Sequence, residues 1–196
     1  LAAGMLRASS WDRWSTLVDP FCGSGTIPIE AALLARNIAP GLNRSFAFMH
    51  WQDFDAKLWK SIQKEAITQI RSDCPPIKAS DRDAGAIEMA KANAKRAGVL
   101  KNIEFSCQAV SAIEPVGRGW VVTNPPYGLR VSSNKDLRNL YAQLGNVLRE
   151  KCPGWQAAIL CSDTQLLRQT RLSFEFPIST INGGIPVRLG VGEIGL

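Results

Sequence analysis

The sequence predicts an α/β domain built on a doubly wound, mostly parallel sheet of seven strands. Three observations lead to this prediction. Strand-like apolar runs alternate with segments of helical periodicity, a glycine-rich turn separates the first run from the first helix, and the C-terminal segment has the pattern of an antiparallel hairpin. The chain has 196 residues, which is long enough to bury one core without a metal or a disulfide. We therefore expect a single domain over residues 1–196.

Five strand-like runs precede the hairpin and alternate with helical periodicity through most of the sequence, so we expect five βα units. In chain order, the strands are expected at Thr16–Val18, Ile77–Ser80, Ile103–Cys107, Trp120–Thr123 and Ala157–Cys161. Two helices are expected at Ile27–Ala35 and Asp83–Ala97. Two more are expected where apolar residues share one helical face, namely Leu58, Ile62, Ala66 and Ile70, and then Leu137, Leu140, Leu144, Val147 and Leu148.

Proline and glycine support these boundaries. Pro28 lies in the first turn of a helix, where the N–H that proline lacks would have no partner. Pro75-Pro76 ends the helix that carries Leu58 and Ile70, and Gly98 ends the helix expected at Asp83–Ala97. At the tail, Asn182-Gly183-Gly184 separates two strand-like runs, and glycine supplies the positive φ that a tight hairpin turn needs. The sheet is therefore expected to end in antiparallel strands.

Composition excludes several classes of protein. With 45% hydrophobic and 20% charged residues, the chain is neither disordered, collagen-like nor a coiled coil. No apolar stretch is long enough for a membrane span, and no basic leader for a signal peptide is seen, so we expect a cytoplasmic protein without a membrane partner. Five scattered cysteines and one histidine argue against a disulfide framework and against a metal site. The net charge of +6 suggests a polyanionic partner.

The strongest motif is Asp19-Pro20-Phe21-Cys22-Gly23-Ser24-Gly25-Thr26, between the first strand and its helix. Glycines let the backbone pass close to a ligand, and the helix N-terminus offers free N–H groups. Neither a dinucleotide fingerprint, which needs a small residue where Pro28 stands, nor a G-K-[ST] phosphate loop fits this sequence. Asp19 would repel a pyrophosphate but attract an ammonium group, which favours S-adenosylmethionine (SAM). The alternative is a glycine turn needed only for packing.

A second acidic motif follows the second strand. Asp81 and Asp83 flank Arg82 at the point where that strand ends and a helix begins. A carboxylate at this place accepts hydrogen bonds from ribose hydroxyls, whereas the simpler explanation is that one of the two acids caps the helix. We assign Asp81 to the ribose and Asp83 to the cap.

The motif Asn124-Pro125-Pro126-Tyr127 follows the fourth strand directly. The Asn124 oxygen and the Pro125 carbonyl can accept the two N–H bonds of a planar amino group, and Tyr127 can stack on the attached ring. Taken alone, the motif could equally be a strand terminator with a packed tyrosine. Because the fourth strand is expected beside the first, we expect this turn and the turn after Asp19 to meet in one crevice.

These motifs resemble the class I SAM-dependent methyltransferases of the group that carries a THUMP RNA-binding domain, whose members make N2-methylguanosine in rRNA or tRNA. The resemblance also covers Leu1–Leu6, Ala39–Arg44 with Trp51, Phe54, Asp55 and Trp59, and Gly128 and Arg130 after Tyr127. It implies a Rossmann-like, doubly wound seven-stranded sheet with a C-terminal antiparallel β-hairpin. It also implies SAM as cofactor, structured RNA as partner, and methyl transfer to guanine N2.

The resemblance implies a set of site residues. Those expected to hold the cofactor are Asp19, Pro20, Cys22, Gly23, Gly25, Thr26, Asp81, Arg82, Gln108, Ala109 and Asn124. Those expected to present the base are Asn124, Pro125 and Tyr127. The chain departs from the family at Ala109, where an aspartate usually binds the adenine amine, and Gln108 or a backbone carbonyl would have to substitute. We expect this chain to be the catalytic domain alone, without a THUMP domain before Leu1.

Several predictions concern other residues or other functions. Trp51 and Trp59 are expected in the core of the 39–59 insertion, and Cys22 is expected to be a packing residue instead of a nucleophile. Basic residues in and around the insertion are either phosphate contacts at the crevice mouth or a solvated face: Arg36, Arg44, Lys57, Lys60 and Lys64. The alternative functions are an adenine-N6 or protein-glutamine methyltransferase, and a module that binds SAM or RNA without catalysis. The oligomeric state is not predicted.

Overall fold

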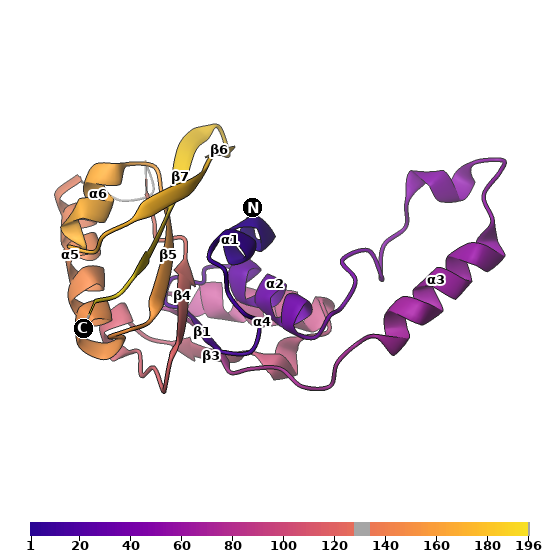
Figure 1. Ribbon diagram of the computed structural model, residues 1–196, viewed down its shortest axis with the longest axis horizontal. Coiled ribbons are helices and arrows are strands. Elements are labelled where there is room, and N and C mark those ends of the chain that lie inside the picture. The colour runs from indigo at the N-terminus through magenta and orange to yellow at the C-terminus, as the bar shows by residue number, and fades with distance from the viewer. Residues whose placement is uncertain (128–133, 196) are drawn as a thin grey trace.

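The computed structural model describes residues 1–127 and 134–195, and a seven-stranded mixed sheet lies at its centre (Figure 1). The strands are β1 (Thr16–Asp19), β2 (Ile77–Asp81), β3 (Glu104–Cys107), β4 (Gly119–Thr123), β5 (Gln156–Cys161), β6 (Glu175–Asn182) and β7 (Ile185–Glu193). The α-helices are α1 (Ala2–Ala8), α2 (Thr26–Ala35), α3 (Ala56–Thr68), α4 (Ala84–Arg96), α5 (Asn134–Lys151) and α6 (Thr164–Gln169). Short 3₁₀ turns are η1 (Ala47–His50), η2 (Leu100–Asn102) and η3 (Val110–Ala112).

The strand order is β3-β2-β1-β4-β5-β7-β6. Strands β1 to β5 are parallel, β7 pairs antiparallel with β5, and β6 pairs antiparallel with β7. The chain therefore winds outward from β1 in one direction and outward from β4 in the other. This confirms the predicted fold class and hairpin, and it puts the topological switch point between β1 and β4, where ligands bind in such sheets.

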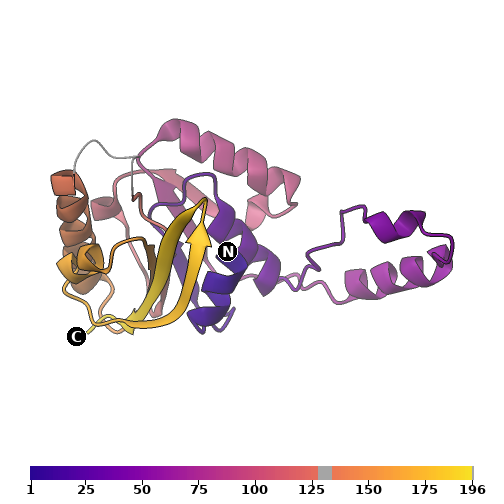
Figure 2. The same ribbon diagram turned by 90° about the horizontal axis from the view of Figure 1, so that it is seen from above.

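Alternate strand residues supply two separate cores, one on each face of the sheet. Leu17 and Val122 belong to the core under α1, α2 and α4, whereas Val18 and Val121 belong to the core under α5 and α6. The period of two along each strand produces this division. Figure 2 shows α5 and α6 on one side of the sheet and α1, α2 and α4 on the other.

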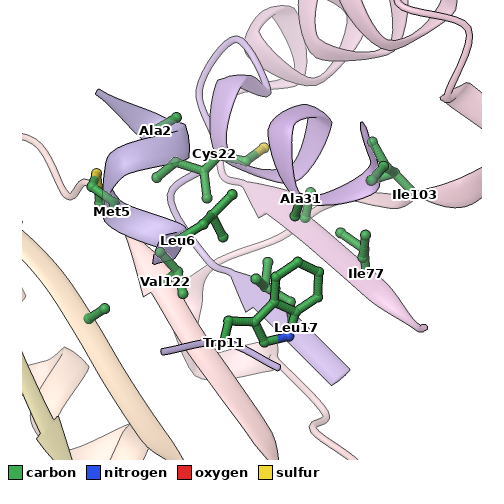
Figure 3. Packing of buried hydrophobic residues seen from close by; sticks show 14 of the residues in the cluster. Ala2, Met5, Leu6, Trp11, Leu17, Cys22, Ala31, Ile77, Ile103 and Val122 are labelled. Atoms are coloured by element: carbon green, nitrogen blue, oxygen red, sulfur yellow. The ribbon is translucent and has the colours of Figure 1, made fainter. Parts of the chain in front are cut away.

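The N-terminal helix α1 seals one of these cores. Met5 and Leu6 of α1 are 1% exposed, and they pack near Leu17 and Val122 of the sheet (Figure 3). Cys22 of the glycine-rich turn points to the same place, next to Ala2 and Leu6 in Figure 3. The turn after β1 is thus anchored from behind by hydrophobic packing.

The segment 36–74, which we call the arm, projects away from the sheet (Figures 1 and 2). None of its residues is buried. Trp59 packs edge-on against Phe46 and Phe48, with ring centroids 5.9 and 5.2 Å apart, as expected of an insertion core. Trp51 is 65% exposed, so the prediction that it lies in that core is wrong. The aromatic cluster of the arm consists instead of Trp59, Phe46, Phe48 and Phe54.

Two further expectations need correction. The third βα unit has no α-helix, because β3 is followed only by the 3₁₀ turn η3. Helix α6 was not predicted, since a helix of six residues is too short to show a periodic apolar pattern.

Candidate functional site

The turns after β1 and β4 meet at the carboxyl edge of the sheet. The hydroxyl of Thr123, the last residue of β4, donates to Asp19 Oδ1 at 2.6 Å, and both residues are buried. The backbone N–H of Phe21 also donates to that oxygen, at 3.2 Å. Asn124 follows Thr123 directly, so the glycine-rich turn and the Asn-Pro-Pro-Tyr turn border the same space.

A crevice of about 880 Å³ opens at this place, which is within the usual range for a small-molecule site. It is lined by nine of the thirteen residues expected to hold the cofactor or present the base: Pro20, Gly23, Asp81, Arg82, Gln108, Ala109, Asn124, Pro125 and Tyr127. Four others, Asp19, Cys22, Gly25 and Thr26, lie beside or behind the lining. Gly128 and Arg130 fall outside the residues that the structure describes.

Asp81 ties the glycine-rich turn to β2. Its Oδ2 accepts the backbone N–H of Gly23 at 3.0 Å, and its Oδ1 accepts the N–H of Asp83 at 3.0 Å. Asp83 caps α4, as expected, by accepting the N–H of Gly85 at 2.8 Å. The Asp81 carboxylate thus lies at the crevice wall, held in place by two backbone donors.

Gly25 has a structural reason to be glycine. Its φ is +84°, and a Cβ placed there would lie 2.9 Å from the Cβ of Ala90 in α4. Gly23 also has a positive φ, +50°, but a Cβ on it would meet nothing within 4 Å. Gly25 therefore permits close packing of the turn on α4, whereas Gly23 faces the crevice.

Asp19 is electrostatically the most unusual group of the site. It is 1% exposed, and burial raises its pKa from 3.8 to about 7, against the opposing effect of the hydrogen bonds from Thr123 and Phe21. The negative charge of Asp81 raises the pKa further. Oδ2 of Asp19 is buried and has no hydrogen-bond partner within residues 1–127 and 134–195. A cation at this oxygen would offset the cost of burying the charge.

Asn124 carries a second buried acceptor without a partner. Its Oδ1 forms no hydrogen bond to any residue in the described part of the chain. Buried polar atoms are nearly always paired in native proteins, and exceptions mark places where a ligand or water binds. Asn124 lines the crevice, so this oxygen belongs to the site.

The structure adds residues that sequence reasoning missed. From α5, Asn139, Leu140 and Gln143 line the crevice, and from the β6–β7 turn, Asn182, Gly183 and Ile185 do so. The sequence predicts the hairpin turn, but the position of that turn over the crevice depends on the register between β5 and β7. The basic residues of the arm are absent from this lining. The arm leaves from the C-terminus of α2, at the opposite edge of the sheet, so of the two alternatives for its basic residues the structure favours a solvated face away from the crevice.

The next features are the cysteine of the glycine-rich turn, the residues that could bind a metal, and the helices that could cross a membrane. Burial raises the pKa of the Cys22 thiol, and the charges of Asp19 and Asp81 raise it further, so Cys22 is a neutral packing residue and not a nucleophile. Within residues 1–127 and 134–195, no group of three His, Cys, Asp or Glu side chains is arranged to hold a metal ion. Among the helices described, none is both long and apolar enough to cross a membrane.

Known proteins are similar to this chain in sequence and in fold. The sequence profile of the family described as "RMKL-like, methyltransferase domain" matches residues 1–182. The chain belongs to this family. As an RMKL-like methyltransferase domain, it is 42% identical over 192 residues to the ribosomal RNA large subunit methyltransferase K/L of Shewanella sp. (strain MR-4). That alignment covers 94% of this chain and 27% of the relative, so the chain spans about a quarter of the length of the curated relatives it matches.

Solved structures with the same domain are also similar. SMU.472, crystallised in complex with SAH, superposes with a TM-score of 0.92 at 31% identity, over 100% of this chain and 52% of that one. A predicted N6-adenine-specific DNA methylase from Listeria monocytogenes str. 4b F2365 superposes with a TM-score of 0.83 at 35% identity, over 97% of this chain and 50% of that one. These two neighbours carry different functional descriptions on one fold.

Proposed function

We propose that this RMKL-like domain transfers a methyl group from SAM to the exocyclic N2 of a guanine in structured RNA. One observation carries the proposal: two buried acceptor oxygens without partners, Asp19 Oδ2 and Asn124 Oδ1, belong to turns that meet at one crevice. The first suits an ammonium group and the second suits an amino group that donates hydrogen bonds. A cationic methyl donor and an amine acceptor supply these two groups.

The residues around Asp19 fit SAM. Asp19 and Gly23 would hold the methionine part, and Asp81, at the end of β2, would accept hydrogen bonds from the ribose hydroxyls. Gln108 and Ala109 border the same crevice, where they would contact the adenine. When bound, SAM supplies a methyl group on a positively charged sulfur. The crystal complex of SMU.472 with SAH supports this choice of cofactor.

The residues after β4 fit a planar amine. An exocyclic amine is a weak nucleophile because its lone pair is delocalised into the ring, so the enzyme must orient it. Asn124 Oδ1 and the Pro125 carbonyl would accept its two N–H groups, and Tyr127 would stack on the ring. Positioning of this kind supplies much of the rate in a reaction between two bound groups.

The names of the relatives and the charge of the chain support RNA as the substrate. The Shewanella relative is named as a methyltransferase of large-subunit rRNA, and the net charge of +6 on this chain suits a polyanion. A guanine in a paired helix would have to be flipped out, or presented from a loop, to reach Tyr127. An rRNA or tRNA substrate would place the reaction in the cytoplasm.

The test is a methylation assay with the 196-residue chain, SAM and large-subunit rRNA transcribed in vitro, followed by mass spectrometry of the nucleosides. We expect N2-methylguanosine. Asn124→Ala should abolish turnover while calorimetry shows that SAM still binds, because the variant loses the contact with the amine and keeps the cofactor contacts of Asp19, Gly23 and Asp81. Asn146→Ala, on the exposed side of α5, is the matched control and should behave as wild type. Turnover by Asn124→Ala would contradict the proposed role, and no SAM binding at millimolar concentration would favour a non-catalytic module.

A second candidate is an adenine-N6 methyltransferase. The Listeria neighbour is described as specific for N6 of adenine, and Asn-Pro-Pro-Tyr can hold any planar NH2 group. The same assay separates the two, since N6-methyladenosine in place of N2-methylguanosine would support the second candidate.

A further inference from the structure

The β6–β7 hairpin extends past the carboxyl edge of the parallel strands. Cys161, the last residue of β5, pairs with Arg188, so Ile185–Val187 of β7 have no partner in β5. These residues pair only with β6, and the two strands close in a two-residue turn in which Gly183 and Gly184 have φ values of +56° and +83°. Figure 1 shows the tip of the hairpin rising beyond the end of β5. The turn therefore overhangs the crevice.

The hairpin makes one specific contact with the Asn-Pro-Pro-Tyr turn. Asn182 Nδ2 donates to the hydroxyl oxygen of Tyr127 at 2.7 Å. The two residues are 55 positions apart in the sequence, both are half-buried, and both line the crevice. The Tyr127 ring is thus attached to the turn after β4 at one end and is held by the hairpin at the other.

A tyrosine ring has two side-chain torsions, and a hydrogen bond at its far end restricts both. The ring also packs against the core under α1, α2 and α4 on one side, and the hydrogen bond restricts the tilt that this packing leaves at the crevice edge. Ring tilt would alter the plane on which a nucleobase stacks, and hence the direction of its amino group toward the methyl donor. Small misplacements of reacting groups lower the rate of transfer.

We propose that Asn182 is a positioning residue, which holds the Tyr127 ring in the orientation that presents the target base. The expected effect on catalysis rests on the proposed function, whereas the hydrogen bond between Asn182 and Tyr127 does not depend on it. Asn182→Leu has a similar size and no donor, and it should lower kcat about three- to tenfold, the effect of one neutral hydrogen bond. The KM for RNA and the affinity for SAM should stay within about twofold, because neither depends on the ring orientation to the same extent.

Asn182 and Tyr127 should act as a unit. Tyr127→Phe keeps the ring and removes the acceptor, so the double variant should lose no more activity than the more affected single variant. Thr180→Ala is the matched control, an exposed residue of β6 that is outside the crevice lining, and it should retain wild-type kcat. If the losses of the two single variants multiply in the double variant, Asn182 does not act through Tyr127 and the proposal is overturned.

A spectroscopic readout separates this proposal from the proposed function. The chain has two tyrosines, so labelling tyrosine with 13C at Cζ yields two NMR signals, which Tyr127→Phe assigns. Asn182→Leu should shift the Tyr127 signal and leave that of the buried Tyr141 in place, and Thr180→Ala should shift neither. An unchanged Tyr127 signal would overturn the proposal. If the wild type methylates no RNA while the signal shifts, the proposed function fails and the contact with Asn182 is still supported.

Discussion

Replacing the buried carboxyl of Asp19 by an amide should remove a large part of the pH dependence of stability. The pKa of Asp19 is raised from 3.8 to about 7, chiefly by burial. The folded chain therefore binds a proton on Asp19 at pH values where the unfolded chain has released it. The stabilisation is fully present below about pH 4 and is lost as the pH rises through about 7.

The magnitude follows from the size of the shift. Each pKa unit corresponds to about 1.4 kcal/mol, so a raise of this size amounts to about 4 kcal/mol over the whole range. Between pH 5 and 8, the part accessible to experiment, it amounts to about 3 kcal/mol. Asp19→Asn keeps an oxygen that can accept from Thr123 and has no charge to bury, so this contribution should vanish.

The assay is urea unfolding of wild type and Asp19→Asn at several pH values, from which the free energy of unfolding is extrapolated. The difference between the two proteins cancels the titration of other groups, including the single histidine, His50. The variant should gain stability relative to wild type by about 3 kcal/mol from pH 5 to pH 8. Parallel profiles would refute the inference that Asp19 is buried with a raised pKa.

Three other predictions follow from the same structure. Gly25→Ala should lower the free energy of unfolding by about 2 to 4 kcal/mol, because the strain of a positive φ and a clash with Ala90 add. Gly23→Ala should lower it by only about 1 kcal/mol, and equal losses of unfolding free energy in urea would contradict this. SAM binding should release almost one proton at pH 6 and none at pH 8.5, because a cation at Asp19 lowers the pKa of that carboxyl. Calorimetry in buffers of different ionisation enthalpy measures the number of protons released, and no release at pH 6 would contradict the prediction. Replacing residues 39–67 by a short Gly-Ser linker should change the free energy of unfolding by about 1 kcal/mol or less, since these residues belong to neither core of the sheet, and a larger loss would show that the arm supports the core.

Much of the fold could be predicted because its signals are local. The alternation of apolar residues around Leu17-Val18 and Val121-Val122 encodes strands buried on both faces, and the glycines at 183 and 184 encode a two-residue turn. Helix α6 is too short to carry a periodic apolar pattern, although Asp163 at its N-cap is a local signal for a helix start. The period of Leu58 and Ile62 correctly indicated a helix, yet Leu58 is 58% exposed. Periodicity reports a helical face and does not report whether anything covers it.

The candidate site was predictable only in part. Asp81 and Asn124 stand at strand ends, where the chemistry of each residue is visible in the sequence. Asn182 was recognised as a hairpin residue and nothing more, since a contact over 55 positions leaves no local trace.

The chemistry of single residues was thus determined by the sequence: an acid before a glycine-rich turn, an amide before two prolines, and the strands that carry them. Tertiary structure decided which of these residues meet. The order β1-β4 brings Thr123 within 2.6 Å of Asp19, and the pairing of Cys161 with Arg188 carries the hairpin to Tyr127. The physical reason is that strand order and register minimise the free energy of the whole packed sheet, and no short segment contains that information.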